Sequence, residues 1–439
     1  MGPELAVSLF TNIVFVTLSA VILLVFVHRP TSGALALLIA IAFVPYLTIL
    51  GTSFRVELIL LPSMLALLVL RRSRLGMAVP PVVWPLLVLW FCIFAVSAFR
   101  LMNEDVNSIL WSNVYAFLRP ALYLLLFYNL PFSRDESLRI TRYFAYSAIP
   151  LGILAVGQSL GNPLATWLTI EAYTSPFRTS VANLLEETGR ILRATSVFET
   201  PAYAATYFLL SLGTALLWIV SPPIRLRYTQ QIVLLFSAFA AAIGGLLTLS
   251  ATFVAGISLL ALWMLLLVNR RAKSKTLLVS MVVLGILIAL GGSLLKKDSQ
   301  ISGSLAYQVN RVVSLNLLGT RYDAEKGILA DTMTAVLERP LLGWGWTRRG
   351  DVFLGDSIYV VLLYYGGVLA LGLLGAVLLA TVPVSLRTGF LGRILLLWLV
   401  VMLGGGFGSP TFFIPRLGGW WWALVGMVYG VYRRRHLCR

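Results

Sequence analysis

The sequence is poor in charged residues, in acids, in cysteine and in histidine. Only 12% of its 439 residues are charged, and 17 acids stand against 34 bases. Cys92 and Cys438 are too far apart to indicate a disulfide, a redox pair or a metal site. No nucleotide-binding glycine loop and no cluster of metal ligands is visible, so we expect neither a cofactor nor a metal.

Long apolar runs dominate what is present. Hydrophobic residues make up 59% of the chain, and the mean hydropathy is +0.90. Such a composition excludes a soluble globular protein. We expect an all-α fold, a polytopic bundle of transmembrane helices with a large, partly helical outer loop. No small-residue cleavage site follows the first apolar run, so residues 6–27 are expected to be a retained span.

The apolar runs predict 12 to 13 spans, of which two are short for a bilayer of roughly 30 Å. The expected spans cover residues 6–27, 32–50, 56–70, 79–99, 114–131, 143–160, 202–220, 231–249, 251–268, 276–295, 357–380, 393–407 and 418–432. They divide the chain into N-terminal helices (1–160), a first outer loop (161–200), central helices (201–295), a large outer loop (296–356), and C-terminal helices with a tail (357–439).

Charge orients these spans. If alternate loops face the cytoplasm, that side holds 19 bases and two acids, whereas the other side holds 14 bases and 15 acids. This asymmetry follows the positive-inside rule and places the C-terminus in the cytoplasm. The excess of bases is therefore topological, and we expect no nucleic-acid partner. The Trp420–Trp422 run is expected to form an interfacial belt.

The two long outer loops hold most of the candidate site residues, because long loops in a compact bundle usually carry function. The large loop alone contains seven acids and eight bases. Taken singly, Arg190 and Arg193 have a simpler interpretation, as contacts to lipid headgroups or partners of Glu186, Glu187 or Glu199. Asp356, at the mouth of a span, could equally be a helix N-cap. Arg119 lies within a span, where an unpaired charge is costly.

Together these residues favour chemistry on an anionic lipid. Guanidinium groups stabilise a diphosphate leaving group with permanently charged, bidentate donors and no metal. A carboxylate such as Asp356 could accept the proton of an incoming sugar hydroxyl. The arginines available for the diphosphate are Arg190, Arg193, Arg321, Arg348 and Arg349 on the outer side, and Arg119 from below.

Three stretches resemble a known family. RATSVFETP, from Arg193 to Pro201, is similar to the arginine-to-proline motif of the bacterial O-antigen ligase and O-antigen polymerase superfamily. RYDAEKGILADTMTAVLERPLLGWGW resembles its arginine, amphipathic helix and Pro-Leu-Leu-Gly-x-Gly pattern, and DSIYVVLLYYGGVLALGLL resembles its closing helix. The similarity covers roughly residues 185–400.

The resemblance implies a metal-independent, inverting glycosyltransferase of the GT-C type in the bacterial inner membrane, with its active site facing the periplasm. Its donor would be an undecaprenyl diphosphate-linked oligosaccharide. By position, Arg193 would be a diphosphate-binding arginine with Arg190 nearby, and Arg321 a second essential arginine. With Asp356, the candidate base proposed on its own chemistry, Arg193 and Arg321 are the expected catalytic residues. The expected substrate-binding residues are Arg190, Arg119, Arg348, Arg349 and Tyr359.

The acceptor remains open. The ligases carry a histidine before the asparagine of the closing helix, where this chain has Asp356-Ser357. This difference favours a polymerase, which joins lipid-linked repeat units and can work with a chain-length regulator, over a ligase, which uses lipid A-core as acceptor. A transporter of lipid-linked glycans is the alternative from another class, although no pair of corresponding broken helices marks a midplane site.

Overall fold

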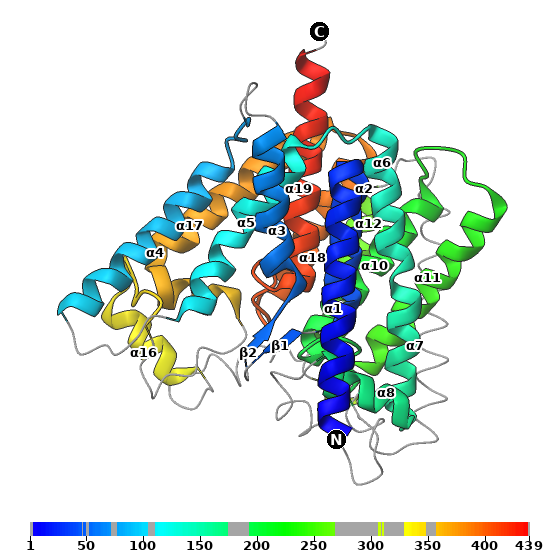
Figure 1. The fold of residues 1–439 in the computed structure, drawn as a ribbon, viewed down its shortest axis with the longest axis horizontal. Helices are drawn as coiled ribbons and strands as arrows, with labels where there is room; N and C mark the ends of the chain where they lie inside the picture. Colours follow the sequence, from blue (N-terminus) through cyan, green and yellow to red (C-terminus); the bar gives the residue numbers. More distant parts are fainter. Residues whose placement is uncertain are drawn as a thin grey trace. The chain divides into compact units, whose positions relative to one another are not determined.

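The computed structural model describes residues 3–45, 47–49, 52–71, 77–103, 110–173, 193–267, 306–308, 310, 329–347 and 357–437. The expected all-α, polytopic helical bundle is confirmed (Figure 1). The helices form two compact units that do not follow the linear order of the chain. Unit 1 contains Met1–Leu67 and Phe132–Asn310, and unit 2 contains Leu68–Pro131 and Arg311–Arg439.

Among the described residues, six helices are long and apolar enough to cross a membrane, so the chain is a multi-pass membrane protein. These spans are Thr11–His28, Val83–Asn103, Arg134–Ser159, Pro201–Val220, Tyr228–Leu247 and Ile358–Arg387. Shorter apolar helices cover Pro30–Phe43, Ala251–Met264 and Phe390–Gly405. A helix forms at twelve of the thirteen expected spans, and the remaining one, 276–295, lies outside the described residues.

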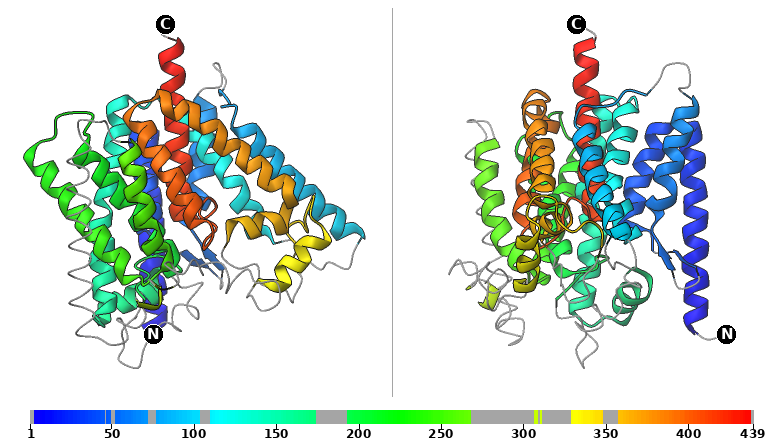
Figure 2. Two further views of the ribbon diagram at one scale, coloured as in Figure 1. Left: turned by 180° about the vertical axis from the view of Figure 1, so that it is seen from behind. Right: turned by 90° about the vertical axis from the view of Figure 1, so that its left-hand side faces the viewer.

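Unit 1 is built around one largely buried helix, α10. Its helices are α1 (Pro3–His28), α2 (Pro30–Phe43), the first part of α3 (Val56–Arg71), α6 (Arg134–Tyr146), α7 (Ala148–Ser159), α8 (Pro163–Trp167), the π-helix η1 (Leu168–Tyr173), α10 (Pro201–Val220), α11 (Tyr228–Leu247) and α12 (Ala251–Leu267). The apolar window of α10 is 89% buried, as expected for a helix that is hydrophobic on all sides. It packs against α6, α11 and α12, and α11 lies along α7 (Figure 2).

Two parts of unit 1 differ from the sequence prediction. The expected span 32–50 ends as a helix at Phe43, and Leu47–Ile49 (β1) then pairs antiparallel with Thr52–Phe54 (β2). The two short strands contain β-branched residues and are separated in the sequence by only two residues, a spacing typical of a hairpin. The expected span 143–160 begins earlier, at Arg134. Ser133 and Glu136 form a capping box there, so the bases assigned to a loop begin a helix.

Unit 2 contains α4 (Val83–Asn103), α5 (Trp111–Asn129), α16 (Ala330–Glu338), α17 (Ile358–Arg387), α18 (Phe390–Gly405) and α19 (Pro415–Leu437). Helix α19 packs along α5, and α17 packs along α4. Helix α16 covers the end of the helix expected after Arg321, and residues 321–328 lie outside the described range.

The expected interfacial belt at Trp420–Trp422 is wrong. These three side chains are between 0 and 2% exposed and belong to the core. The indole N–H of Trp422 donates to the carbonyl of Phe412 at 2.8 Å, and the rings of Trp421 and Phe412 meet edge to face. Tertiary packing therefore uses the three indoles to fill the space around the loop that precedes α19.

Candidate functional site

The arginine-to-proline motif forms a well-defined segment of unit 1, Arg193–Thr200, which leads into α10. Thr200 caps that helix, because its side-chain oxygen accepts from the backbone N–H of Tyr203 at 3.3 Å. Pro201 occupies the first helical position, where a missing N–H leaves no gap in the hydrogen bonding. The motif therefore encodes the start of the most enclosed helix in the unit.

One glutamine holds the middle of this segment. The buried side-chain oxygen of Gln158, at the end of α7, accepts from the backbone N–H groups of Thr195 (3.1 Å) and Ser196 (2.9 Å). Its amide nitrogen donates to the carbonyl of Ser196 (3.0 Å) and to the hydroxyl of Thr169. All four bonds join buried residues, so they restrict the backbone at Thr195 and Ser196.

The segment also contains a residue in the left-handed region of backbone conformation. Ser196 has φ = 52°, which is uncommon for a residue other than glycine and costs on the order of 1–3 kcal/mol. The Ser196 hydroxyl offsets part of this cost by donating to the carbonyl of Leu151 at 2.9 Å. The N–H of Ala194 donates to the carbonyl of Leu247 at 2.9 Å. These contacts place Arg193 beside the last turn of α11.

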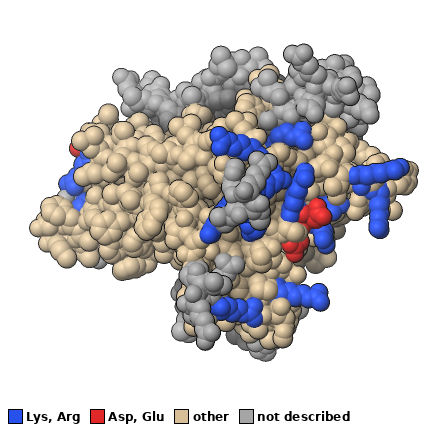
Figure 3. All heavy atoms as spheres, turned by 90° about the horizontal axis from the view of Figure 1, so that it is seen from above, with Lys and Arg blue, Asp and Glu red and all other residues tan. Residues whose placement is uncertain are grey.

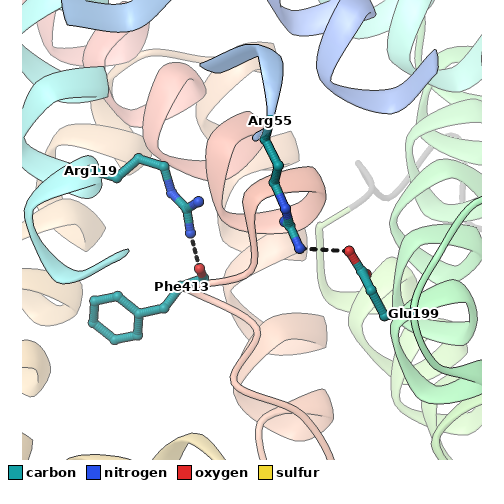
Figure 4. Close-up of polar contacts among 4 residues, drawn as sticks. All are labelled: Arg55, Arg119, Glu199 and Phe413. Atoms are coloured by element: carbon teal, nitrogen blue, oxygen red, sulfur yellow. Dashed lines mark hydrogen bonds and ion pairs between the residues drawn. The ribbon is translucent and has the colours of Figure 1, made fainter. Parts of the chain in front are cut away.

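A partly buried ion pair fixes the other end of the segment. Arg55, just after the hairpin, donates from Nη2 to Glu199 Oε1 at 2.7 Å (Figure 4). The Glu199 side chain is 3% exposed and that of Arg55 is 20% exposed. Glu199 was expected as a possible ion-pair partner of Arg190 or Arg193. In the structure it forms an ion pair with Arg55, a residue that the sequence motifs did not indicate. The sequence feature that could have indicated Arg55 is its position as a single basic residue in the short outer loop between two expected spans.

In unit 2, Arg119 has a structural partner. It lies in α5, which continues as a helix through Pro120, and it is 5% exposed. Its Nη2 donates to the backbone carbonyl of Phe413 (Figure 4), and the ring of Phe413 stacks on Phe117 at 4.3 Å. The guanidinium thus holds the loop before α19, and its role in substrate binding stays a prediction.

The Pro-Leu-Leu-Gly-x-Gly motif completes a broken helix in unit 2. Helix α17 is interrupted at Gly367, which has φ = 63°. The turn at Pro340–Gly345 supplies the hydrogen bonds that the break removes. Trp344 N–H donates to Tyr364 O (2.6 Å), Gly345 N–H to Tyr365 O (2.9 Å), and Pro340 O accepts from Val368 N–H (2.8 Å). The closing helix and the loop motif are therefore one structural unit.

Two arginines hold Trp344 in this turn. The guanidinium carbon of Arg100 lies 4.5 Å from the centre of the indole, and that of Arg339 lies 4.6 Å from it. Arg100 also donates to the carbonyl of Trp344 at 2.9 Å and to the hydroxyl of Thr347. Arg100 was expected in a loop, but α4 continues to Asn103 and leaves it 5% exposed.

The start of α17 places one predicted site residue. Tyr359 donates its hydroxyl to the carbonyl of Leu403 at 2.6 Å, and its ring packs against Phe407. Ser357 is the N-cap residue of this helix, and its side chain makes no capping hydrogen bond. Asp356 lies outside the described residues, so both its capping alternative and its role as a base stay predictions. The N–H of Ile358 donates to the carbonyl of Gly406 at 2.9 Å, which joins the start of α17 to the end of α18.

Arg193 belongs to unit 1, and Arg119 and Tyr359 belong to unit 2. The other predicted site residues lie outside the described range: Arg190, Arg321, Arg348, Arg349 and Asp356. Their catalytic and binding roles stay predictions. The residues that sequence analysis missed, Gln158, Arg55 and Arg100, are polar side chains that lie near or beyond the ends of apolar runs.

Basic side chains gather at the ends of helices that the charge distribution assigned to the cytoplasm. Figure 3 shows a face on which lysine and arginine outnumber acids. In unit 1 the helix ends that share this character are linked directly, since Thr31 at the start of α2 donates to Glu136 at the start of α6 (3.1 Å). The exposed bases near these ends of unit 1 are Arg29, Arg134, Arg139, Arg225 and Arg227.

No family model matches the sequence, and no curated protein matches it significantly.

Proposed function

We propose that this protein is a membrane glycosyltransferase that moves a glycan from an undecaprenyl diphosphate carrier at the periplasmic face of the bacterial inner membrane. It acts as a polymerase that joins O-antigen or exopolysaccharide repeat units. The observation that carries the proposal is the Arg193–Thr200 segment. A membrane protein has here a strained backbone, held by hydrogen bonds to Gln158, immediately after an arginine at the end of spanning helices.

Such rigidity supports a binding role for Arg193. A guanidinium whose backbone has one arrangement loses less entropy when it binds a diphosphate, and its planar donors match the phosphate oxygens. The Arg55–Glu199 pair supports the same role, since it fixes the segment from the opposite end. Arg190 and Arg321 complete the anionic site in this proposal.

The reaction is a single displacement. A hydroxyl of the acceptor sugar attacks the anomeric carbon of the donor glycan, and the bond from that carbon to the diphosphate oxygen breaks with inversion. The electron pair stays on undecaprenyl diphosphate, where the arginines stabilise the added negative charge. Asp356 takes the proton from the attacking hydroxyl. Glu199 is less suited to that task, because it is buried in an ion pair with Arg55.

The acceptor is proposed to be a second lipid-linked glycan. Asp356-Ser357 stands where the ligases of the resembling superfamily carry a histidine, and this difference disfavours lipid A-core as the acceptor. The contribution of a chain-length regulator is part of the same proposal.

Transport is the weaker alternative. A broken spanning helix is a feature of transporters, and α17 is broken at Gly367. In transporters the unwound backbone groups bind the substrate or ion. Here the groups on both sides of the break, Tyr364 O, Tyr365 O and Val368 N–H, are bonded to the Pro340–Gly345 turn. The break therefore serves packing within unit 2.

The test is glycan transfer in reconstituted membranes. The assay supplies undecaprenyl diphosphate-linked oligosaccharide, with and without lipid A-core, in the presence of a chelator and without nucleotide sugars. A ladder of longer lipid-linked products without lipid A-core is the expected result. Transfer only with lipid A-core would show a ligase, and no transfer in either case would favour transport.

The arginine requirement is tested in the same assay. Arg193→Ala and Arg321→Ala are each expected to abolish the ladder, and the lysine variants to restore part of it, because a point charge cannot replace a planar fork. Arg225→Ala is the matched control, since Arg225 is an exposed arginine of unit 1 on the basic side. Normal ladders in both Arg193→Ala and Arg321→Ala would contradict the proposal.

A further inference from the structure

An apolar groove runs between α7 and α11 on the surface of unit 1. Its volume is about 410 Å³, within the range of roughly 300–1,000 Å³ that is usual for ligand sites. The walls include Ile149, Ile153 and Val156 of α7 and Val233, Phe236 and Phe239 of α11. Ile153 is 67% exposed and Phe236 is 62% exposed, so the groove opens outward from two membrane-spanning segments.

Small residues form the floor of this groove. A Cβ atom on Gly152 would lie 2.6 Å from the carbonyl oxygen of Ala240, which shows that the two helices approach closely there. The larger side chains stand on either side of this line of contact. The result is a channel along the helix pair, without charged residues among those that line it.

The groove leads toward the Arg193–Thr200 segment. Val156 and Ile243 line it, and both helices continue beyond these residues by about one turn or less. In that last turn Gln158 of α7 binds Thr195 and Ser196, and Leu247 of α11 binds Ala194. The ends of the same two helices therefore lie beyond the groove and hold the residues that follow Arg193.

We propose that this groove holds the part of a polyprenyl chain nearest to its diphosphate, so that the headgroup reaches Arg193. This inference rests on the proposed function and names the tail-binding site of its donor. The groove lies along two membrane-spanning helices, where the available ligand is a hydrocarbon chain. The ends of these helices contact the residues that follow Arg193, whose charge suits an anionic headgroup. A methyl-branched chain fits a channel whose floor is made of glycine and alanine.

Site-specific photocrosslinking tests the groove without requiring glycan transfer. A benzophenone amino acid replaces Phe236 in the groove, and in a matched control it replaces Leu235, which is 54% exposed on the same helix and does not line the groove. The full chain is reconstituted in phosphatidylethanolamine and phosphatidylglycerol vesicles with radiolabelled undecaprenyl diphosphate. We expect strong labelling at position 236 and weak labelling at 235, reduced by unlabelled undecaprenyl diphosphate but not by added phosphatidylglycerol.

Other labelling patterns would overturn the inference. Equal labelling at both positions, or equal competition by phosphatidylglycerol, would identify ordinary surrounding lipid. A crosslink from position 236 to a second copy of the chain would identify the groove as a protein interface.

A second variant narrows the groove near the arginine motif. Val156→Trp is expected to reduce crosslinking at position 236 and to reduce transfer, whereas Leu235→Trp retains transfer. Unchanged crosslinking in Val156→Trp, with unchanged thermal unfolding, would also overturn the inference. Specific crosslinking by a wild-type-like protein that transfers no glycan would refute the proposed function and leave the groove as a polyprenyl-lipid site. Transfer without specific crosslinking would refute the groove alone.

Discussion

Gln158 makes the strongest prediction at the scale of single residues. Gln158→Leu keeps the size of the side chain but leaves the N–H groups of Thr195 and Ser196 without their acceptor. We expect the free energy of unfolding to fall by about 1–3 kcal/mol and transfer to fall strongly, because Arg193 loses its fixed backbone. Thermal unfolding and the transfer assay measure the two effects.

The control for this variant is Gln231→Leu, which changes an exposed glutamine on α11. It should leave both unfolding and transfer unchanged. Full glycan transfer by Gln158→Leu would show that the hydrogen bonds of Gln158 to Thr195 and Ser196 have no part in function.

The Arg55–Glu199 pair predicts a strong coupling between two residues. Arg55→Ala leaves a carboxylate that is 3% exposed without this partner. We expect a loss of about 2–3 kcal/mol in stability, below the value for a fully buried pair because Arg55 is partly exposed. Glu199→Gln should cost less, since an amide carries no charge to bury. If the stability losses of the two single variants add up in the double variant, the interaction between Arg55 and Glu199 contributes nothing to stability.

At the scale of elements, the break in α17 predicts opposite results for two glycines of the same helix. A Cβ on Gly367 would lie 2.2 Å from the carbonyl oxygen of Leu341, and its φ of 63° is unfavourable for alanine. Gly367→Ala should lower stability by about 1–3 kcal/mol and detach the Pro340–Gly345 turn. Gly372→Ala is the control, because a Cβ there meets nothing within 4 Å. The thermal midpoint should fall in the first variant and stay or rise in the second.

At the scale of the whole molecule, the charge distribution predicts which helix ends face the cytoplasm. The background variant carries Cys92→Ser and Cys438→Ser. In it, Leu164→Cys should react with an impermeant thiol reagent added from the outer side of the membrane, measured in intact inner-membrane vesicles or spheroplasts. A cysteine at Arg227 should report the opposite side. Both positions are exposed in unit 1. Labelling of both from the same side would contradict the proposed topology.

Much of the fold could be predicted from the sequence. Apolar runs identify spanning helices because the backbone must satisfy its own hydrogen bonds in lipid, and helices formed at every expected span within the described residues. Helix ends were less predictable. Ser133 and Glu136 start α6 well before its apolar part, and α4 extends past the end expected at residue 99 to Asn103. In both cases local capping and tertiary contacts decided the boundary, not hydropathy.

The candidate site was predictable only as a set of residue types. The sequence by itself determined that the protein is a helical membrane protein and which helix ends are basic. It also identified the motif that contains Arg193. These features depend on local composition and spacing. The tertiary structure alone decided that Gln158 clamps the motif, that Glu199 pairs with Arg55, and that a loop motif completes the broken α17. These are contacts between distant parts of the chain, and no local pattern specifies which polar partners meet when the helices pack.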